Sequence, residues 1–222
     1  MRRIINTMVV AVGFLATGWS QSAQAQLSYE WNRDTQPVTG SIQVDEGSTV
    51  ALRVYLREQT GGTTLQNQRL SSFGVRARYD NPTGVVSVPD TNAISRNPAF
   101  TDFYLPAVNN PTSAQFTAAV AIQDPGVSPD TDNRIWLGTF TFTVASGIGA
   151  TQTTIRAIDI PQSDDTFTGT GTQLDSLIAD APLVIEVVPV PEPMTILLAG
   201  SVALTALQTA RRLRRRRIDS VN

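Results

Sequence analysis

The sequence predicts an all-β fold, an antiparallel β-sandwich, flanked by an N-terminal signal peptide and a C-terminal transmembrane helix. Short segments of alternating apolar and polar residues recur through the middle of the chain, and clusters of Gly, Pro, Asn and Asp separate them. No helical period of useful length occurs between the two ends. We therefore expect one domain over residues 26–188, because roughly 160 residues can bury one good core.

The first half of this domain contains three predicted strands. Leu27 to Trp31 is expected to be an edge strand. Ser48 to Arg57 alternates cleanly and is expected to point four residues inward: Val50, Leu52, Val54 and Leu56. Ser71 to Tyr79 alternates in the same way, with Phe73, Val75, Ala77 and Tyr79 on its inner face. Residues 59–69 are polar and contain a Gly-Gly pair, which predicts a loop.

The second half is expected to supply the remaining strands: Val85 to Val88, Ala114 to Ile122, Arg134 to Val144, Thr151 to Ile160 and Pro182 to Val188. In the longest of them the predicted inward residues are Trp136, Phe140, Phe142 and Val144. Residues 92–110 show no regular pattern, and residues 163–180 form a polar connection with room for a short hairpin. Seven to nine short strands of this kind are typical of a sandwich.

The N-terminus has the layout of a secretory signal peptide over residues 1–25. Arg2 and Arg3 form the positive start, and Met8 to Trp19 is the apolar core. Ala23 and Ala25 form an A-x-A cleavage site for signal peptidase, which would leave Gln26 as the mature N-terminus. The alternative is a retained membrane anchor.

The C-terminal segment, residues 189–222, has three parts in a fixed order. Pro191, Glu192 and Pro193 interrupt regular structure, because each proline fixes φ and lacks a backbone donor. Residues 194–210 carry no charged side chain. As a helix they would be roughly 25 Å long, which is short for the apolar layer of a membrane but sufficient to span it. Six arginines then form a basic tail within 211–217: Arg211, Arg212, Arg214, Arg215, Arg216 and Arg217.

These arginines are expected to stay on the cytoplasmic side of the membrane, with the domain on the other side. The alternative is a buried helix followed by a solvated basic tail. The order of Pro-Glu-Pro, apolar run and arginine cluster resembles the PEP-CTERM sorting domain of exported bacterial proteins. The resemblance implies a partner, an exosortase, which is a membrane-embedded protease or transpeptidase that processes the tail near Pro-Glu-Pro.

A second resemblance covers the middle of the chain. It rests on three segments: Gly47 to Leu56, Leu70 to Pro82, and Leu137 to Val144. Their strands and turns are similar to those of a cohesin-like jelly-roll sandwich, the fold that binds dockerins in cellulosomes. The resemblance implies the jelly-roll arrangement of strands and a binding face on the sandwich.

The absence of three residue types limits the chemistry. The sequence has no histidine and no cysteine, and all 17 basic residues are arginine. Ser-His-Asp and Cys-His nucleophiles, histidine-ligated zinc, a P-loop lysine and a Schiff base are therefore excluded. Only carboxylate chemistry remains, and the acids lie mainly in turns. We expect that the protein is not an enzyme.

Charge and surface residues indicate what the domain can bind. Residues 26–190 hold 9 Arg and 17 Asp+Glu, a net charge of −8, which argues against nucleic acid as a partner. Extracellular polysaccharide is a candidate partner, through a stripe of strand arginines: Arg53, Arg57, Arg76 and Arg78. These arginines could instead pair with acids across a sheet. Trp31 and Trp136 are candidate platforms for sugars, although the alternation of Trp136 with Phe140 favours a core position.

Calcium is the one cofactor that the sequence raises. Asp124, Asp130, Asp132 and Asn133 place hard oxygen ligands in a single loop. The loop departs from the EF-hand pattern, because Ile135 and Thr141 stand where that pattern has glycine and glutamate. A solvated acidic turn explains the same residues.

We therefore expect an exported structural or adhesion protein of the cell surface or extracellular matrix. It would pass through an inner-membrane intermediate and be delivered to the cell envelope or beyond. The alternative is a carbohydrate- or protein-binding module that uses the cohesin-like face.

Overall fold

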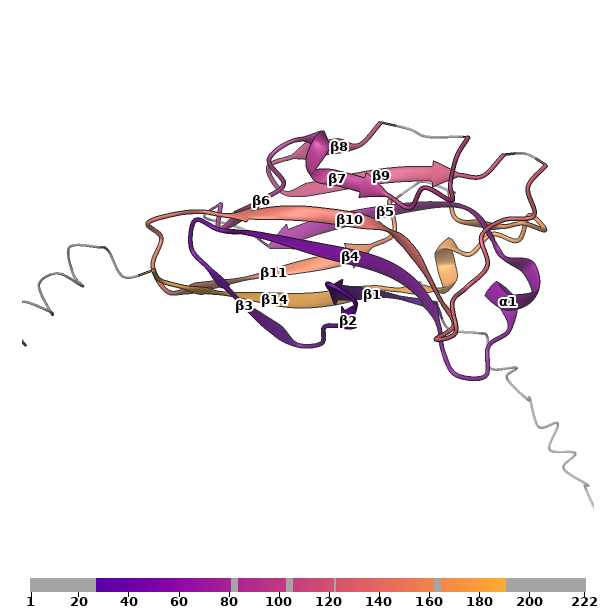
Figure 1. Ribbon diagram of the computed structural model, residues 1–222, viewed down its shortest axis with the longest axis horizontal. Helices are drawn as coiled ribbons and strands as arrows, with labels where there is room; N and C mark the ends of the chain where they lie inside the picture. The colour runs from indigo at the N-terminus through magenta and orange to yellow at the C-terminus, as the bar shows by residue number, and fades with distance from the viewer. Residues whose placement is uncertain (1–26, 81–83, 103–105, 122, 162–164, 191–222) are drawn as a thin grey trace, which may run out of the picture.

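The computed structural model describes residues 27–80, 84–102, 106–121, 123–161 and 165–190. In this part of the chain two β-sheets lie face to face (Figure 1), which confirms the predicted sandwich. The signal peptide (1–25) and the sorting segment from residue 191 onward lie outside the described residues. Among the residues that are described, no helix is long and apolar enough to span a membrane.

The first sheet is centred on three long strands. They are β1 (Leu27–Arg33), β4 (Thr49–Glu58) and β10 (Arg134–Val144), with β4 in the middle. Four short strands extend this sheet, the first two along β1 and the others along β10: β13 (Ile178–Ala179), β2 (Gln36–Pro37), β6 (Val86–Ser87) and β7 (Ile94–Arg96). The predicted edge position of the first strand is therefore wrong, because β13 and β4 pair with its two sides.

The second sheet runs in the order β3, β14, β11, β5, β9, β8. Its strands are β3 (Ser41–Asp45), β14 (Ala181–Val188), β11 (Thr151–Ile158), β5 (Leu70–Asp80), β9 (Ser113–Ala119) and β8 (Val108–Asn110). The short strand β12 (Phe167–Thr168) also pairs with β5. Most neighbours in both sheets are antiparallel, as expected, but β13 runs parallel to β1 and β3 runs parallel to β14.

Three short helical segments join these strands: α1 (Thr64–Gln68), η1 (Thr91–Ala93) and η2 (Asp175–Leu177). The first of them lies where a loop was predicted, and its five residues are too few to show a helical period. Glu58 explains why a helix forms here. Its Oε1 accepts a hydrogen bond from the Thr64 N–H (2.7 Å) and its Oε2 accepts one from the Leu65 N–H (2.9 Å). The carboxylate thus satisfies the first donors of α1 while Leu65 enters the core.

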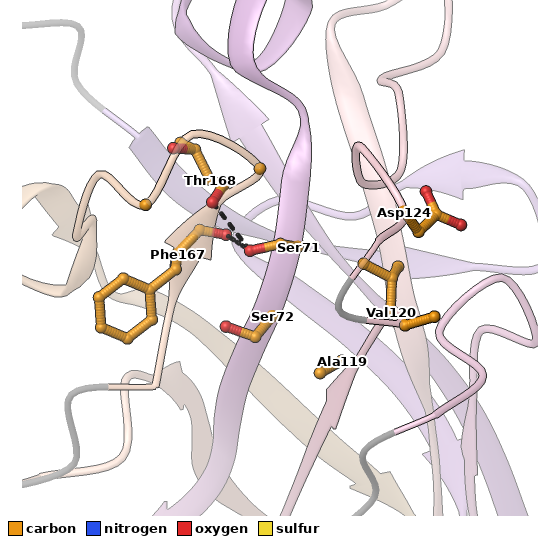
Figure 2. A pocket seen from close by; sticks show the side chains of 10 residues that line it. Ser71, Ser72, Ala119, Val120, Asp124, Phe167 and Thr168 are labelled. Carbon is orange, nitrogen blue, oxygen red and sulfur yellow. Dashed lines mark hydrogen bonds between the residues drawn. The ribbon is translucent and has the colours of Figure 1, made fainter.

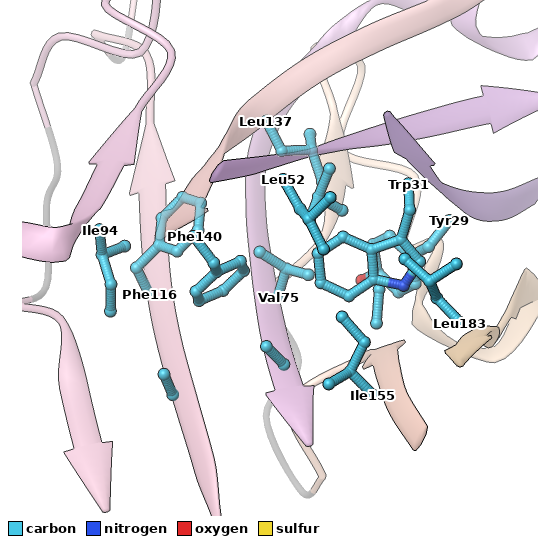
Figure 3. Packing of buried hydrophobic residues seen from close by; sticks show 14 of the residues in the cluster. Tyr29, Trp31, Leu52, Val75, Ile94, Phe116, Leu137, Phe140, Ile155 and Leu183 are labelled. Atoms are coloured by element: carbon cyan, nitrogen blue, oxygen red, sulfur yellow. The ribbon is translucent and has the colours of Figure 1, made fainter. Parts of the chain in front are cut away.

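The core fills the space between the sheets with side chains from both (Figure 3). The inward residues predicted for β4 and β5 are all buried, because period-2 alternation places every second side chain on one face. Trp31 is 1% exposed, and its ring meets Phe140 and Phe142 edge-on at centroid distances of 6.2 and 6.1 Å. Its Nε1 donates a 2.9 Å hydrogen bond to the Ala181 carbonyl oxygen, so the polar edge is satisfied as well.

A β-bulge in β10 changes which side of the sheet Trp136 occupies. Trp136 pairs with Tyr55, but Gly138 pairs with the next residue of β4, Val54, so Leu137 is an extra residue. Leu137 enters the core while Trp136 is half-buried on the outer face. The predicted inward position of Trp136 is therefore wrong, because an uninterrupted alternation does not hold across a bulge.

Candidate functional site

Three carboxylates from separate segments meet beside the end of β11. Asp159 follows β11, Asp165 precedes β12, and Asp175 begins η2. Each offers an oxygen that lies within 4.8 Å of the other two, and all three residues are half-buried. Within the described ranges this is the group of acids with the spacing of metal ligands. Sequence reasoning missed it because the members come from separate segments. Asp159 lies at the end of a predicted strand, and Asp165 and Asp175 lie in different parts of the polar connection at 163–180.

Hydrogen bonds attach this cluster to both sheets. The Asp175 Oδ1 accepts from the Thr166 N–H (3.1 Å), whereas its Oδ2 is buried and has no hydrogen-bond partner. The hydroxyl of Tyr29 lies 3.5 Å from Asp159 Oδ1 and donates its hydrogen bond to the Gly74 carbonyl oxygen at 2.9 Å. A Cβ at position 74 would overlap the carboxylate of Asp165, so only glycine leaves room for the cluster.

Burial and mutual repulsion control the charge of the cluster. Burial, followed by the charges of Asp175 and Asp165, raises the pKa of Asp159 from 3.8 to about 7. Burial and the three carboxylates also raise the pKa of Tyr29 well above its usual value, so this phenol stays neutral. A shared proton relieves the repulsion, and three hard oxygen ligands at this spacing could equally hold a divalent cation such as Ca²⁺.

The acidic loop that the sequence marked for calcium is arranged differently. Asp130 and Asp132 both form ion pairs with Arg134, at 3.0 and 3.1 Å. Asp124 lies in a separate turn, where its Oδ1 accepts from the Gly126 N–H (2.9 Å). The side-chain amide of Asn133 donates to the Gly62 carbonyl oxygen at 3.4 Å. Arginine therefore already neutralises two of the four candidate ligands.

The outer face of the first sheet carries two stacked pairs of arginine and an aromatic ring. The Arg134 guanidinium lies 4.7 Å from the ring centroid of Tyr55, and the Arg53 guanidinium lies 5.4 Å from that of Trp136. Tyr55 and Trp136 are direct neighbours across β4 and β10, so the two stacks are adjacent. Both distances are within the range of cation–π attraction. Trp136 is thus the surface tryptophan of the sandwich, and Trp31 belongs to the core.

The four strand arginines do not form one stripe. Arg53 and Arg57 lie on β4 in the first sheet, whereas Arg76 and Arg78 lie on β5 in the second. The outer faces of two stacked sheets point in opposite directions. Three of the four side chains have polar partners, since Arg57 pairs with Glu30 (2.8 Å), Arg78 with Asp80 (3.8 Å) and Arg76 with the Gln115 side chain (2.7 Å).

A small open pocket of about 270 Å³ lies beside β5, between β12 and the end of β9 (Figure 2). The Ser71 hydroxyl at its centre is within 2.9 Å of the carbonyl oxygens of Phe167 and Thr168, and the Ser72 hydroxyl donates to Asp165 O at 2.7 Å. Both hydroxyls are thus bound to the backbone. Among the described residues that line the pocket, Asp124 is the one with a charged side chain. The pocket brings together none of the cluster carboxylates.

The fold is similar to that of solved cohesin structures. The crystal structure of a complex of CaCohA2 with CaDoc0917 aligns with a TM-score of 0.50 at 12% identity, covering 72% of this chain and 99% of that one. A type III cohesin module from the cellulosomal ScaE cell-surface anchoring scaffoldin of Ruminococcus flavefaciens aligns with a TM-score of 0.49 at 9% identity, covering 75% and 90%. The solution structure of CaCohA2 from Clostridium acetobutylicum gives 0.47 at 12% identity, covering 74% and 92%.

No protein-family model matches the chain, and no curated protein matches it. At such low identities the similarity shows the fold alone. The expected cohesin-like β-sandwich is therefore confirmed at the level of architecture.

Proposed function

We propose that this protein is an exported, non-enzymatic module of the cell surface or extracellular matrix, sorted and processed through its C-terminal segment. The observation that carries the proposal is the order of features at the end of the chain. Pro191, Glu192 and Pro193 precede an uncharged run, and the run precedes the arginine cluster that ends at Arg217. That order favours an exosortase as the enzyme that processes the C-terminal segment. The A-x-A site at Ala23 and Ala25 favours signal peptidase as the enzyme that cleaves the N-terminal segment before it.

The chemistry of the sandwich is compatible with either side of the inner membrane. Its core depends on neither a disulfide nor a cysteine, so the redox state of the compartment does not affect it. The six tail arginines would remain on the cytoplasmic side of the inner membrane, which puts the sandwich on the opposite side until processing releases it.

The sandwich itself would serve as a structural or adhesion module that binds a protein partner. The support is the architecture, which it shares with a CaCohA2 complex. Its two large outer faces carry paired charges and no described nucleophile–base pair, which suits binding better than catalysis. The alternative is a carbohydrate-binding module.

Cell fractionation of three versions of the full chain tests the sorting proposal. The unaltered chain should reach the envelope or medium in a shortened form. A variant with Pro191→Ala and Pro193→Ala should accumulate uncut in the inner membrane. Pro189→Ala, which changes a proline outside the tripeptide, should behave like the unaltered chain. Recovery of the unaltered chain at full length in the cytoplasm would refute export and sorting together.

A further inference from the structure

The first sheet contains the same arginine–aromatic arrangement twice, once with its acidic partners and once without them. In the first, Arg134 stacks on Tyr55. Its guanidinium binds three carboxylates, those of Glu30 (2.9 Å), Asp130 (3.0 Å) and Asp132 (3.1 Å). Stacking occupies the flat face of a guanidinium and leaves the N–H groups on its edge free to bind carboxylates.

In the second arrangement Arg53 stacks on Trp136 in the same way. No carboxylate and no hydrogen-bond acceptor among the described residues contacts its guanidinium, although the residue is only half-exposed. Glu30, an acid of the same sheet, is paired with Arg57 and Arg134. Arg53 therefore lies over Trp136 with N–H donors that no described residue uses, and it lacks the anion that its neighbour Arg134 has.

The residues around Arg53 indicate which kind of molecule would supply a carboxylate to it. Thr139 is its direct neighbour on β10, and Thr141 and Thr143 continue the same outward face. All three threonines are half-buried and present hydroxyl groups. The exposed large apolar residues of the described chain, by contrast, are Val108, Val188 and Val190, and these lie on other elements. The aromatic surface of this face beside Arg53 is the ring of Trp136, which Arg53 covers, and the neighbouring surface on β10 consists of threonine hydroxyl groups rather than aliphatic side chains.

We propose that Arg53 and Trp136 form a binding site for the carboxylate of an acidic polysaccharide, with a sugar ring lying along the threonines of β10. The carboxylate of a uronate residue would accept two N–H groups from the edge of the Arg53 guanidinium. The hydroxyl groups of the sugar would meet those of Thr139 and Thr141. This site goes beyond the proposed function and depends neither on the processing of the tail nor on a protein partner.

Binding of polygalacturonate to the full chain in detergent micelles tests the site, with the six tail arginines replaced by glutamine so that they do not bind the polyanion. Dextran is the neutral control polymer and polyglutamate is the acidic peptide. The fluorescence of Trp136 reports binding directly, because a carboxylate on Arg53 changes the charge beside the indole. Subtracting the signal of the Trp136→Phe variant removes the contributions of Trp19 and Trp31.

We expect polygalacturonate to bind with a change in fluorescence that Trp136→Phe abolishes, and dextran to give none. Arg53→Ala should weaken binding at least about tenfold, since it removes a bidentate charge-assisted contact. Arg78→Ala is the matched control, because Arg78 lies on the opposite sheet and pairs with Asp80, and it should bind within about twofold of the unaltered chain.

Three outcomes would overturn the site. They are no binding of polygalacturonate, equal binding by Arg53→Ala and the unaltered chain, and tighter binding of polyglutamate than of polygalacturonate. The melting temperature of each variant is measured alongside, to show that the variant is folded. If Arg53→Ala does not fold, the change in Trp136 fluorescence of the unaltered chain still shows whether polygalacturonate binds beside Trp136. None of these outcomes bears on export or on cleavage near Pro191, so the two proposals fail separately.

Discussion

The hydroxyl of Tyr29, on β1, donates a 2.9 Å hydrogen bond to the backbone carbonyl oxygen of Gly74, on β5. Tyr29 is 4% exposed, and the bond joins the two sheets through the core next to Asp159. Because Gly74 also leaves room for Asp165, this contact connects the packing of the sandwich to its acidic cluster.

Removal of this hydroxyl should destabilise the domain. We expect Tyr29→Phe to lower the free energy of unfolding by about 1–2 kcal/mol, because the buried Gly74 carbonyl oxygen loses its side-chain donor. Tyr55→Phe is the control, since the Tyr55 ring stacks with Arg134 and its hydroxyl makes no hydrogen bond to a described residue. It should change stability by less than about 0.5 kcal/mol. Chemical denaturation measures both, and equal effects would argue against the inter-sheet bond.

The stability of the domain should depend on pH near neutrality through Asp159. Its pKa is raised in the folded state to about 7 from 3.8, mainly by burial. The folded chain therefore holds a proton that the unfolded chain has already lost in this window. The stabilisation is fully present below the unfolded pKa of 3.8 and is lost as the pH rises to the folded pKa of about 7, so stability should fall between about pH 5 and 7 and level off above that.

Asp159→Asn isolates this effect, because it leaves an uncharged group that cannot titrate. We expect the variant to be more stable than the unaltered chain at pH 8 and to show a flatter dependence between about pH 5 and 7. Thermal unfolding in the presence of a chelator measures this, so that no divalent cation neutralises the carboxylates. Asp90→Asn is a suitable control, since Asp90 caps the exposed turn η1 outside the cluster. A pH slope that survives in Asp159→Asn would contradict the assignment.

Glu58 should be required for the α1 turn. It is 1% exposed, and each of its oxygens accepts a backbone N–H of that turn. Glu58→Ala leaves both donors without a partner and should cost about 2–3 kcal/mol, whereas Glu58→Gln keeps one acceptor and should cost less. Glu186→Ala, on β14, should have little effect, because Glu186 makes no ion pair with a described residue. Denaturation curves and hydrogen exchange at Leu65 would measure the loss, and unchanged protection there would refute the role.

The sequence predicted the sandwich well because its strands follow the simplest rule of sheet structure. The inward residues of β4 and β5, such as Leu52 and Val75, alternate without interruption and all enter the core. The prediction that Trp136 points inward was wrong because Leu137 is the extra residue of a β-bulge. The bulge reverses the alternation of inward and outward side chains, and the polarity of the sequence does not reveal it. The helix α1 was missed because its cap, Glu58, comes from the preceding strand rather than from the position before the helix.

The candidate sites were harder to predict than the fold. The acids Asp159, Asp165 and Asp175 are neighbours only after three segments have packed around Tyr29, and no sequence spacing records that arrangement. For the strand arginines, the sequence predicted a shared surface that the structure does not contain. Arg53 and Arg76 have the same pattern in sequence, but they lie on different sheets, so equal alternation does not mean a common surface.

The mass of the chain recovered from the cell surface tests the central claim, export followed by processing of the tail, most directly. Intact-mass and terminal-peptide mass spectrometry on the envelope fraction identify both ends of the mature protein. We expect a chain that begins at Gln26 and ends close to Pro191, without the arginines of the tail. A surface chain that still carries Arg211 to Arg217 would contradict processing, and an intact chain that begins at Met1 and remains in the cytoplasm would contradict export as well.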